Sequence, residues 1–207
     1  MSEDSNKSLS LHKVPQKSEK HNTLCHITKK SINAGIIYSF YDTHKAMTKH
    51  NPMLFYFAYG SNMNPARMVE RGLKIADIFS GWVDGFALRF NKRSRRDALL
   101  ACANMVFSQG ERIEGVLYQL ESMIEIGKLD SHEGTPYFYS REIFPIQTKQ
   151  GPKPAWTYVA NPAVIDNTIK PARWYVEHLL AGRDYLTEAY YAAIDRTVCR
   201  EAVEVRW

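Results

Sequence analysis

Residues 53–63 read MLFYFAYGSNM, and this stretch decides the fold. Its first half is an apolar run rich in aromatic residues, which predicts a buried strand over Met53–Ala58. The run breaks abruptly into small and polar residues, so we expect a turn over Tyr59–Met63. A strand followed by such a turn brings the backbone N–H groups of the turn close together.

The residues after this turn predict a short helix. Asn64 is a favourable N-cap and Pro65 a favourable first helical residue, so a helix is expected over Ala66–Arg71, closed by Gly72. The first N–H groups of a helix have no intrahelical partner, and the helix dipole favours negative charge there. The strand–turn–helix unit therefore predicts an anion site at the turn.

The net charge of +5 is concentrated at the N-terminal end of the chain. Residues 1–52 hold 8 basic and 4 acidic residues, whereas residues 53–207 hold 19 basic and 18 acidic residues. We expect a basic, partly disordered leader over 1–52 and one folded domain over 53–207. Within the leader, residues 32–40 are compatible with a strand or with an amphipathic helix. A nearly neutral domain argues against nucleic-acid binding.

The compartment is indicated by what the sequence lacks. No apolar run approaches the roughly 20 residues of a membrane span, and the N-terminus has no apolar secretory core. Cys25, Cys102 and Cys199 lie far apart with no C-x-x-C pair. Such a set is typical of a reducing compartment, so we expect a cytoplasmic protein that neither enters a membrane nor forms disulfides.

The remainder of the chain alternates short strands with short helices and shows no internal repeat. Many short strands with turn signals favour an α+β fold, a small mixed β-barrel of about six strands with flanking helices. A turn is expected at 109–111, where the sequence reads QGE. After the first strand, the expected strands are Gly81–Phe90, Leu99–Phe107, Ile113–Leu120, Tyr137–Ile146 and Ala155–Ala160, and the later helices are Glu121–Leu129, Pro171–Leu180 and Glu188–Arg196.

Glu133 is the most informative candidate for chemistry. It stands between a helix end and Gly134, just before the aromatic cluster Tyr137–Tyr139. A carboxylate that aromatic walls shield from water holds a proton more readily, which suits a general base. The alternative is a solvated carboxylate at a helix C-terminus. Ser61 lacks the G-x-S-x-G setting of a nucleophile, and no P-loop, GxGxxG, HExxH or paired Cys/His spacing indicates a nucleotide, metal or organic cofactor.

Four motifs in order resemble the gamma-glutamylcyclotransferase family, within the AIG2-like superfamily. They read YFAYGSNM at Tyr56–Met63, GVLY at Gly115–Tyr118, LDSHEG at Leu129–Gly134 and AWTYV at Ala155–Val159. The resemblance extends over about Met53 to Arg196 and leaves the leader outside. It implies an enzyme that releases 5-oxoproline from gamma-glutamyl compounds, when the substrate's own alpha-amine attacks its gamma-carbonyl.

The resemblance also implies roles for particular residues. Glu133 would take the proton from the alpha-amine and return it to the leaving amine, without a metal or cofactor. Backbone N–H groups of the turn would serve the oxyanion and the alpha-carboxylate, with the assignment between the two left open. The implied substrate-binding residues are Tyr56, Phe57, Ala58, Tyr59, Gly60, Ser61, Asn62 and Tyr158, with Tyr139 ranked lower.

Several of these residues also have a purely structural interpretation. The strand residues before the turn are typical of a core, Gly60 suits a turn on backbone grounds alone, and Asn62 suits a helix cap. Tyr158 and Tyr139 suit a pocket wall or a barrel core. Arg89, Arg95 and Arg96 could attract an acidic substrate, but a solvated loop is the simpler interpretation for the last two.

The partner implied by the resemblance is a small gamma-glutamyl molecule, and a homodimer is left open. The leaving amine is undecided between an alpha-amino acid, an epsilon-lysyl amine and a natural product that sheds a gamma-glutamyl group. The branch of the family that acts on glutathione opens with a different turn sequence and ranks lower. Two rivals remain, a non-catalytic binding module that keeps the pocket and a basic adaptor that acts through residues 1–52.

Overall fold

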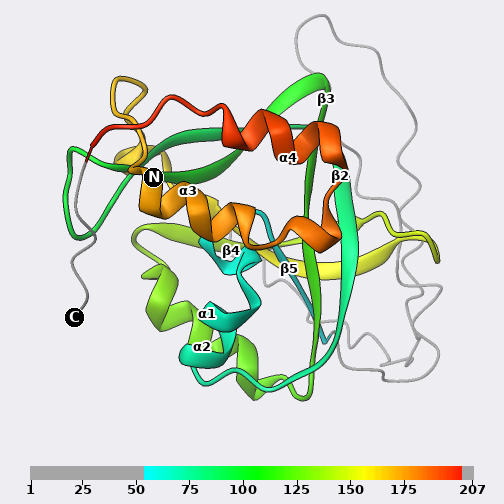
Figure 1. Cartoon of the computed structure of the whole chain (residues 1–207). Coiled ribbons are helices and arrows are strands. Elements are labelled where there is room, and N and C mark those ends of the chain that lie inside the picture. Colours follow the sequence, from blue (N-terminus) through cyan, green and yellow to red (C-terminus); the bar gives the residue numbers. More distant parts are fainter. Residues whose placement is uncertain (1–53, 202–207) are drawn as a thin grey trace, which may run out of the picture. The chain divides into compact units, whose positions relative to one another are not determined.

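The computed structural model describes residues 54–201, and a five-stranded sheet forms their centre (Figure 1). The strand order is β2-β3-β1-β5-β4, with β1 and β5 parallel and all other neighbours antiparallel. The leader and Met53 lie outside the described residues. The strands are β1 (Phe55–Ala58), β2 (Ile75–Arg93), β3 (Ala101–Leu120), β4 (Tyr139–Ile146) and β5 (Lys153–Ala160).

Helices flank this sheet, which confirms the α+β class. In Figure 1, α3 and α4 run along one side of the sheet, while α1 and α2 lie near its lower end. Three short 3-10 turns complete the described chain. The helices are α1 (Pro65–Glu70), α2 (Ile124–Glu133), α3 (Arg173–Leu180) and α4 (Glu188–Asp195), and the 3-10 turns are η2 (Ser61–Met63), η3 (Pro162–Val164) and η4 (Arg183–Tyr185).

The sheet curls as expected for a half-closed barrel but is not continuously closed. Its two edge strands meet where Trp82 N–H donates to the Gln147 carbonyl at 3.0 Å and Gln147 N–H donates back at 2.8 Å. Gln147 directly follows β4, so one pair of bonds links the edge of β4 to that of β2. The strands are bent far enough to enclose one core.

The number of strands is five rather than about six, because two expected strands form one. Residues 99–107 and 113–120 both belong to β3, and the expected turn at 109–111 is a bulge within it. Asp84 pairs with Arg112 but Phe86 pairs with Phe107, so four residues bulge out opposite a single residue of β2. Gly110 has φ +84° at this point. A glycine with positive φ suits a bulge as well as a turn, which is why the sequence signal misled.

The first helix begins and ends where the sequence predicts. The Asn64 side chain accepts the Ala66 N–H at 3.0 Å, and Pro65 is the first helical residue. Helix α2 differs more, because it starts at Ile124 and continues to Glu133 instead of ending at Leu129. Glu133 therefore stands in the last helical turn, and its side-chain direction is fixed by the helix.

The central strand β1 presents alternate side chains to different surroundings, as strand geometry requires. Phe57 is fully buried, and its ring fits against two glycines that pair across β2 and β3, Gly81 and Gly115. A Cβ at Gly115 would lie 2.3 Å from the Ala58 carbonyl oxygen and 2.9 Å from the Phe57 ring. These glycines are thus required by the close approach of the ring. The largest fully buried side chains include Tyr118, Phe57, Met63, Met68, Ile113, Leu117, Ile146 and Leu179.

We predict that Gly115→Ala destabilises the domain, because the new methyl group would overlap a backbone oxygen that cannot move independently. Overpacking of this kind costs about 1–3 kcal/mol. Gly127→Ala in α2 is the matched control, since its Cβ would meet nothing within 4 Å. Alanine in a helix should stabilise by up to about 1 kcal/mol relative to glycine. Urea denaturation of both variants checks this, and equal stability of Gly115→Ala and the unmodified protein would contradict the packing described.

Candidate active site

The side chain of Asn62 joins the turn after β1 to the end of α2. Its Nδ2 donates to the Tyr56 hydroxyl at 2.7 Å and to Glu133 Oε1 at 3.0 Å. Its backbone carbonyl accepts a hydrogen bond from the Tyr118 hydroxyl at 2.8 Å. Asn62 is only 3% exposed, so these bonds form away from bulk water, where an unpaired donor is costly. The turn is therefore locked to both neighbouring strands and to Glu133.

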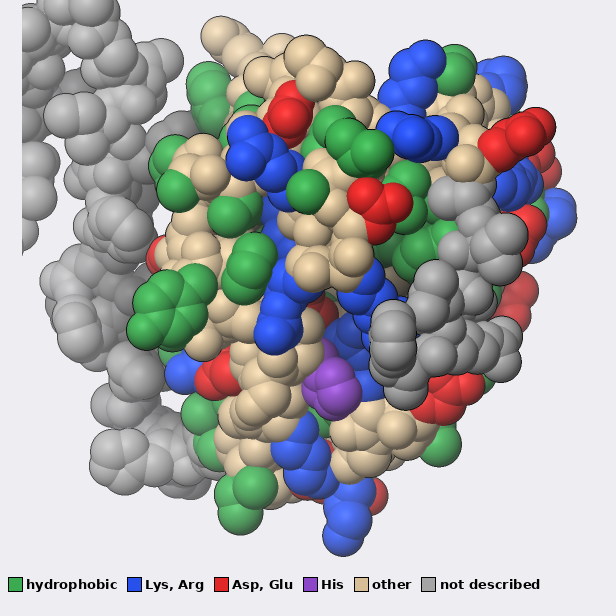
Figure 2. All heavy atoms as spheres, turned by 90° about the vertical axis from the view of Figure 1, so that its left-hand side faces the viewer, with side chains coloured by type: hydrophobic (Ala, Val, Ile, Leu, Met, Phe, Trp, Pro, Cys, Tyr) green, Lys and Arg blue, Asp and Glu red, His purple; other side chains and the backbone are tan. Residues whose placement is uncertain are grey.

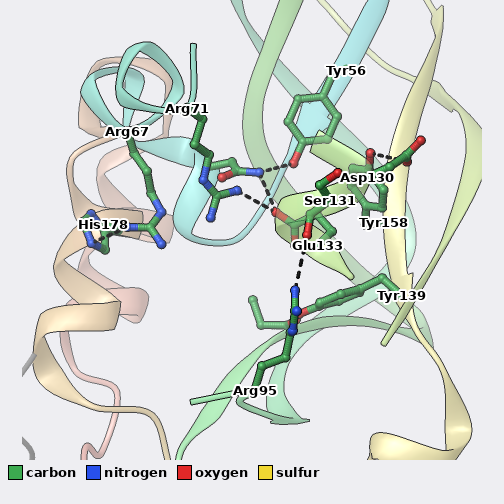
Figure 3. A network of polar contacts seen from close by, with 12 residues as sticks. Tyr56, Arg67, Arg71, Arg95, Asp130, Ser131, Glu133, Tyr139, Tyr158 and His178 are labelled. Carbon is green, nitrogen blue, oxygen red and sulfur yellow. Dashed lines mark hydrogen bonds and ion pairs between the residues drawn. The ribbon is translucent and has the colours of Figure 1, made fainter. Parts of the chain in front are cut away.

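Glu133 reaches this turn because α2 ends directly after it. Gly134 adopts the left-handed conformation with φ +70°, which terminates the helix, and its N–H bonds back to the Asp130 carbonyl. Arg71, at the end of α1, donates from a guanidinium nitrogen to Glu133 Oε1 at 2.9 Å (Figure 3). Both donors thus bind one oxygen. Within residues 54–201, no hydrogen bond reaches the second oxygen, Oε2.

A second carboxylate, Asp130, fixes α2 against the sheet. Its Oδ1 accepts from the Tyr158 hydroxyl at 2.8 Å, and its Oδ2 pairs with Arg141 at 2.7 Å. Tyr158 belongs to β5 and Arg141 to β4. Burial raises the pKa of Tyr158 far above its usual value, with Tyr56 and then Asp130 adding to the shift. The hydroxyl therefore remains a hydrogen-bond donor to Asp130 at neutral pH.

A small cavity of about 30 Å³ lies between the turn and Glu133. Two tyrosines from different elements build its far wall, because Tyr139 donates to the Ala103 carbonyl at 2.7 Å and Ala103 N–H donates to the Tyr175 hydroxyl at 2.9 Å. The lining residues are Tyr56, Tyr59, Gly60, Ser61, Asn62, Ala103, Glu133, Tyr139, Tyr158 and Tyr175.

Gly60 is a close-approach glycine rather than a left-handed one. Its φ is −118°, which other residues adopt freely. A Cβ at this position would lie 3.1 Å from the Ala103 Cβ and 3.2 Å from the Tyr175 hydroxyl oxygen. The absent side chain thus leaves the turn backbone directly against the wall of the cavity.

The tyrosine hydroxyls around the cavity keep their protons. Burial raises the pKa of Tyr56 well above its usual value, and the neighbouring Glu133 carboxylate adds to this. Burial likewise raises the pKa values of Tyr59 and Tyr139, in both cases with a contribution from Tyr175. The Tyr59 hydroxyl donates a hydrogen bond to the Tyr158 carbonyl, and its oxygen accepts one from the Met105 N–H at 3.2 Å. The cavity is therefore walled by neutral hydroxyls around one carboxylate.

A larger pocket of about 420 Å³ lies next to the small cavity and shares Ser61, Glu133, Tyr139 and Tyr175 with it. We call these two spaces the inner cavity and the outer pocket. Lys and Arg side chains gather in the middle of one face of the molecule in Figure 2. The remaining residues of the outer pocket are Arg67, Arg71, Lys92, Ser94, Arg95, Arg96, Cys102, Ser131, His132 and Trp174.

The structure brings most of the sequence-predicted site residues together. The inner cavity holds Glu133 with Tyr56, Tyr59, Gly60, Ser61, Asn62, Tyr139 and Tyr158. Phe57 and Ala58 do not line it and lie in the hydrophobic core. Arg95 and Arg96 line the outer pocket, whereas Arg89 forms an exposed ion pair with Glu111.

Two features of the site differ from the sequence interpretation. The turn contains the 3-10 turn η2, so the N–H groups of Tyr59–Asn62 precede α1, whose N-cap is Asn64 as predicted. Asn62 is consequently free of capping and binds Glu133 instead. Arg71, Asp130 and Tyr175 were not foreseen, and only the Asp130 position within the LDSHEG motif carried a local signal.

The described residues contain no group of three or more His, Cys, Asp or Glu side chains placed to hold a metal ion. Over the same part of the chain, no helix combines the length and apolar character needed to cross a membrane.

The fold is that of gamma-glutamyl cyclotransferase-like α+β domains. A structure named gamma-glutamyl cyclotransferase matches with a TM-score of 0.63 at 19% identity, over 73% of this chain and 92% of that one. An uncharacterised protein from Homo sapiens matches with a TM-score of 0.64 at 19% identity, over the same shares of 73% and 92%. YkqA from Bacillus subtilis matches with a TM-score of 0.62 at 23% identity, over 74% of this chain and 56% of its own.

The model of the family described as "Gamma-glutamyl cyclotransferase, AIG2-like" matches residues 56–177, which is more than half of the chain. The chain therefore belongs to this family. A search of curated proteins found no significant match. The matched range contains the turn after β1, Glu133 and every tyrosine that lines the inner cavity.

We predict that Tyr56→Phe destabilises the domain although its ring contacts with Tyr118 and Tyr158 are retained. The change removes the acceptor of one Asn62 N–H and leaves that donor buried, at a cost of about 1–3 kcal/mol. Tyr137→Phe is the control, because Tyr137 is 81% exposed and should change stability by less than about 0.5 kcal/mol. Chemical denaturation measures both values. A Tyr56→Phe variant as stable as the control would contradict the assigned role of the hydroxyl.

Proposed function

We propose that the protein is a gamma-glutamyl cyclotransferase that releases 5-oxoproline and a free amine from a gamma-glutamyl substrate. The observation that carries this proposal is the position of Glu133, a carboxylate at the boundary of the two spaces whose Oε1 is held by Asn62 and Arg71 while Oε2 is left for a proton. Family membership supports the reaction class. The particular substrate is a separate question.

The inner cavity offers two acceptors for the substrate's alpha-amine. One is Glu133 Oε2. The other is Asn62 Oδ1, a buried oxygen without a hydrogen-bond partner in the described part of the chain. A buried unpaired acceptor costs free energy unless a ligand satisfies it. An ammonium group has three N–H donors and would satisfy both oxygens before it gives a proton to Glu133.

Attack by the freed amine on the gamma-carbonyl then forms the C–N bond of a five-membered lactam. The reaction is intramolecular, so a site that holds the substrate folded supplies much of the rate acceleration. The tetrahedral oxyanion requires donors, and the backbone N–H groups of Tyr59–Asn62 are the candidates. Gly60 favours this arrangement because its lack of a side chain exposes the backbone.

Collapse of the tetrahedral intermediate breaks the bond to the leaving amine, and protonated Glu133 returns its proton to that nitrogen. The carboxylate is thereby restored, and no water is consumed. Arg71 acts as a positioning residue in this scheme, because its ion pair with Oε1 directs Oε2 to the substrate. The side chains of Arg71 and Glu133 are only 12% and 16% exposed, which limits competition from water.

The leaving amine is left open by these residues, because the carboxylate and the turn contact only the gamma-glutamyl half. An alpha-amino acid, an epsilon-lysyl amine and a natural-product amine all fit the reaction, and glutathione ranks lower. We further propose a cytoplasmic location, in keeping with Cys102 and Cys199, the two cysteines of residues 54–201, which are both free.

The test is incubation of the full chain with a panel of gamma-glutamyl amines, with 5-oxoproline scored by mass spectrometry. The panel should include gamma-glutamyl-alanine, gamma-glutamyl-epsilon-lysine, gamma-glutamyl-propylamine and glutathione. Formation of 5-oxoproline from any of them supports the proposal. If none reacts but one or more bind, the protein is a non-catalytic binding module that keeps the pocket.

With the best substrate of that panel, Glu133→Gln should lower kcat by at least about 10²-fold, because the amide cannot accept the proton. Glutamine has nearly the same size as glutamate and can still contact Asn62 and Arg71, so the variant should fold. A circular dichroism spectrum checks this. Glu142→Gln is the matched control, since Glu142 is exposed on β4. Unchanged turnover by Glu133→Gln would refute the mechanism.

We also predict that deletion of residues 1–52 leaves kcat/KM within about 2-fold of the full chain, since every residue that lines the inner cavity lies between 56 and 175. The comparison uses the same substrate and the same 5-oxoproline assay. Loss of activity with the domain still folded would instead favour the adaptor hypothesis, in which the basic leader is the functional part.

A further inference from the structure

The outer pocket is where the leaving half of a substrate must lie, and this inference rests on the proposed cyclotransferase function. The inner cavity of about 30 Å³ is close to the space of a single water molecule. A gamma-glutamyl group therefore extends past Glu133, and whatever is attached to its gamma-carbonyl enters the pocket of about 420 Å³ beyond. The chemistry of that pocket selects the leaving amine.

The outer pocket is strongly basic. Five cationic side chains line it, and Glu133 is its one carboxylate. Arg71 already pairs with that carboxylate. The other titratable groups add no negative charge, because burial and then Arg71 lower the pKa of His132, while burial raises the pKa of the Cys102 thiol. The remaining cations are Arg67, Lys92, Arg95 and Arg96.

Composition does not explain this concentration of positive charge, since residues 53–207 are close to neutral. Outside the pocket, six of the eight described arginines form an ion pair with a carboxylate. Arg67 and Arg95 have no such partner within residues 54–201. Arg95 instead donates to the Ser131 carbonyl at 3.2 Å (Figure 3). It also lies over the Phe138 ring, 5.2 Å from the ring centre.

Lys92 provides a second, independent indication. It is 3% exposed, yet the described chain gives its ammonium no carboxylate. The Nζ atom lies 4.9 Å from the ring centre of Tyr139 and 5.0 Å from that of Phe138. Aromatic faces stabilise a cation only in part, and a buried charge without a counterion is costly. Arg67 also lacks a carboxylate within residues 54–201: its Nη1 lies 3.1 Å from His178 Nε2, and its Nε is buried without a hydrogen-bond partner.

We infer that the outer pocket is an anion subsite and that the preferred leaving amine carries at least two negative charges, as a phosphate or as a pair of carboxylates. An anion seated there would pair with Lys92 from one wall and with Arg67 and Arg95 from the others. Arginine binds phosphate and carboxylate in the same bidentate geometry, so the two sources share one chemistry. The alpha-amine of the gamma-glutamyl half would still lie at the inner cavity, next to Glu133 and Asn62.

The test compares three substrates of the full-length protein that share the gamma-glutamyl group. They are gamma-glutamyl-propylamine, gamma-glutamyl-phosphoethanolamine and gamma-glutamyl-glutamate, and the readout is kcat/KM for 5-oxoproline release. We expect at least one dianionic substrate to exceed the neutral one by roughly 10-fold or more at low salt, with the ratio falling at 0.5 M NaCl because salt screens the pocket. The dianionic substrate with the higher kcat/KM shows whether the preferred leaving amine carries a phosphate or two carboxylates. Equal or better turnover of the neutral substrate overturns the inference.

Variants assign the preference to this pocket. Lys92→Met keeps the length of the side chain and its packing against the two rings, and it should reduce the dianion-to-neutral ratio by several-fold. Arg95→Gln should do the same, because it removes the second cation over the Phe138 ring, so the test does not depend on one variant folding. Arg89→Gln is the control, because Arg89 pairs with Glu111 on an exposed strand, and it should leave the ratio unchanged. A ratio that neither Lys92→Met nor Arg95→Gln alters overturns the assignment.

If neither these three substrates nor the earlier panel releases 5-oxoproline, the proposed function fails while the anion subsite remains testable. Inorganic phosphate and glutarate are then titrated into the protein by calorimetry. Binding to the unmodified protein that weakens in Lys92→Met and in Arg95→Gln supports the subsite alone. Absence of binding, or binding that both variants retain, overturns it.

Discussion

The amide of Asn62 is the interaction on which the rest of the site depends. One nitrogen donates to Tyr56 on the central strand and to Glu133 at the end of α2, although Asn62 and Glu133 are 71 residues apart in the sequence. Both bonds are buried, so each is stronger than in water and each is costly to lose. Without the amide, the carboxylate would be held by Arg71 alone, and its second oxygen would no longer have a fixed direction.

Strand β1 allows one short segment to serve the core and the site together. Phe57 enters the slot formed by two glycines, while Tyr56 stacks on Tyr118, its partner residue across the pair with β3. On the other side, Tyr158 of β5 meets the Tyr56 ring edge-on. The central place of β1 in the strand order thus explains why tyrosines from three strands surround one turn. Site and core cannot be altered independently at this strand.

Local chemistry was predictable from the sequence where it depended on neighbouring residues. The N-cap, the first helical proline and the turn are all decided within a few positions, and short motifs report them. Arg71 and Tyr175 gave no such signal, because their roles depend on partners 62 and 72 residues away along the chain, Glu133 and Ala103 respectively. The bulge in β3 shows the converse, since a local glycine signal could not reveal that the strand continued beyond it.

The distribution of charge in the fold was likewise not predictable from the sequence, and it matters more for function. A domain that is nearly neutral overall can still bring several cations together in one hollow, because their positions are decided by the fold and not by composition. Arg95 belongs to a charged loop segment that is typical of a solvated surface, and yet its side chain reaches the carbonyl of Ser131 beside the catalytic candidate. Lys92 is drawn into the same place by β2, which continues past the expected end of the strand. The length of β2 and β3, rather than any motif, therefore determines the electrostatics that a leaving group would meet.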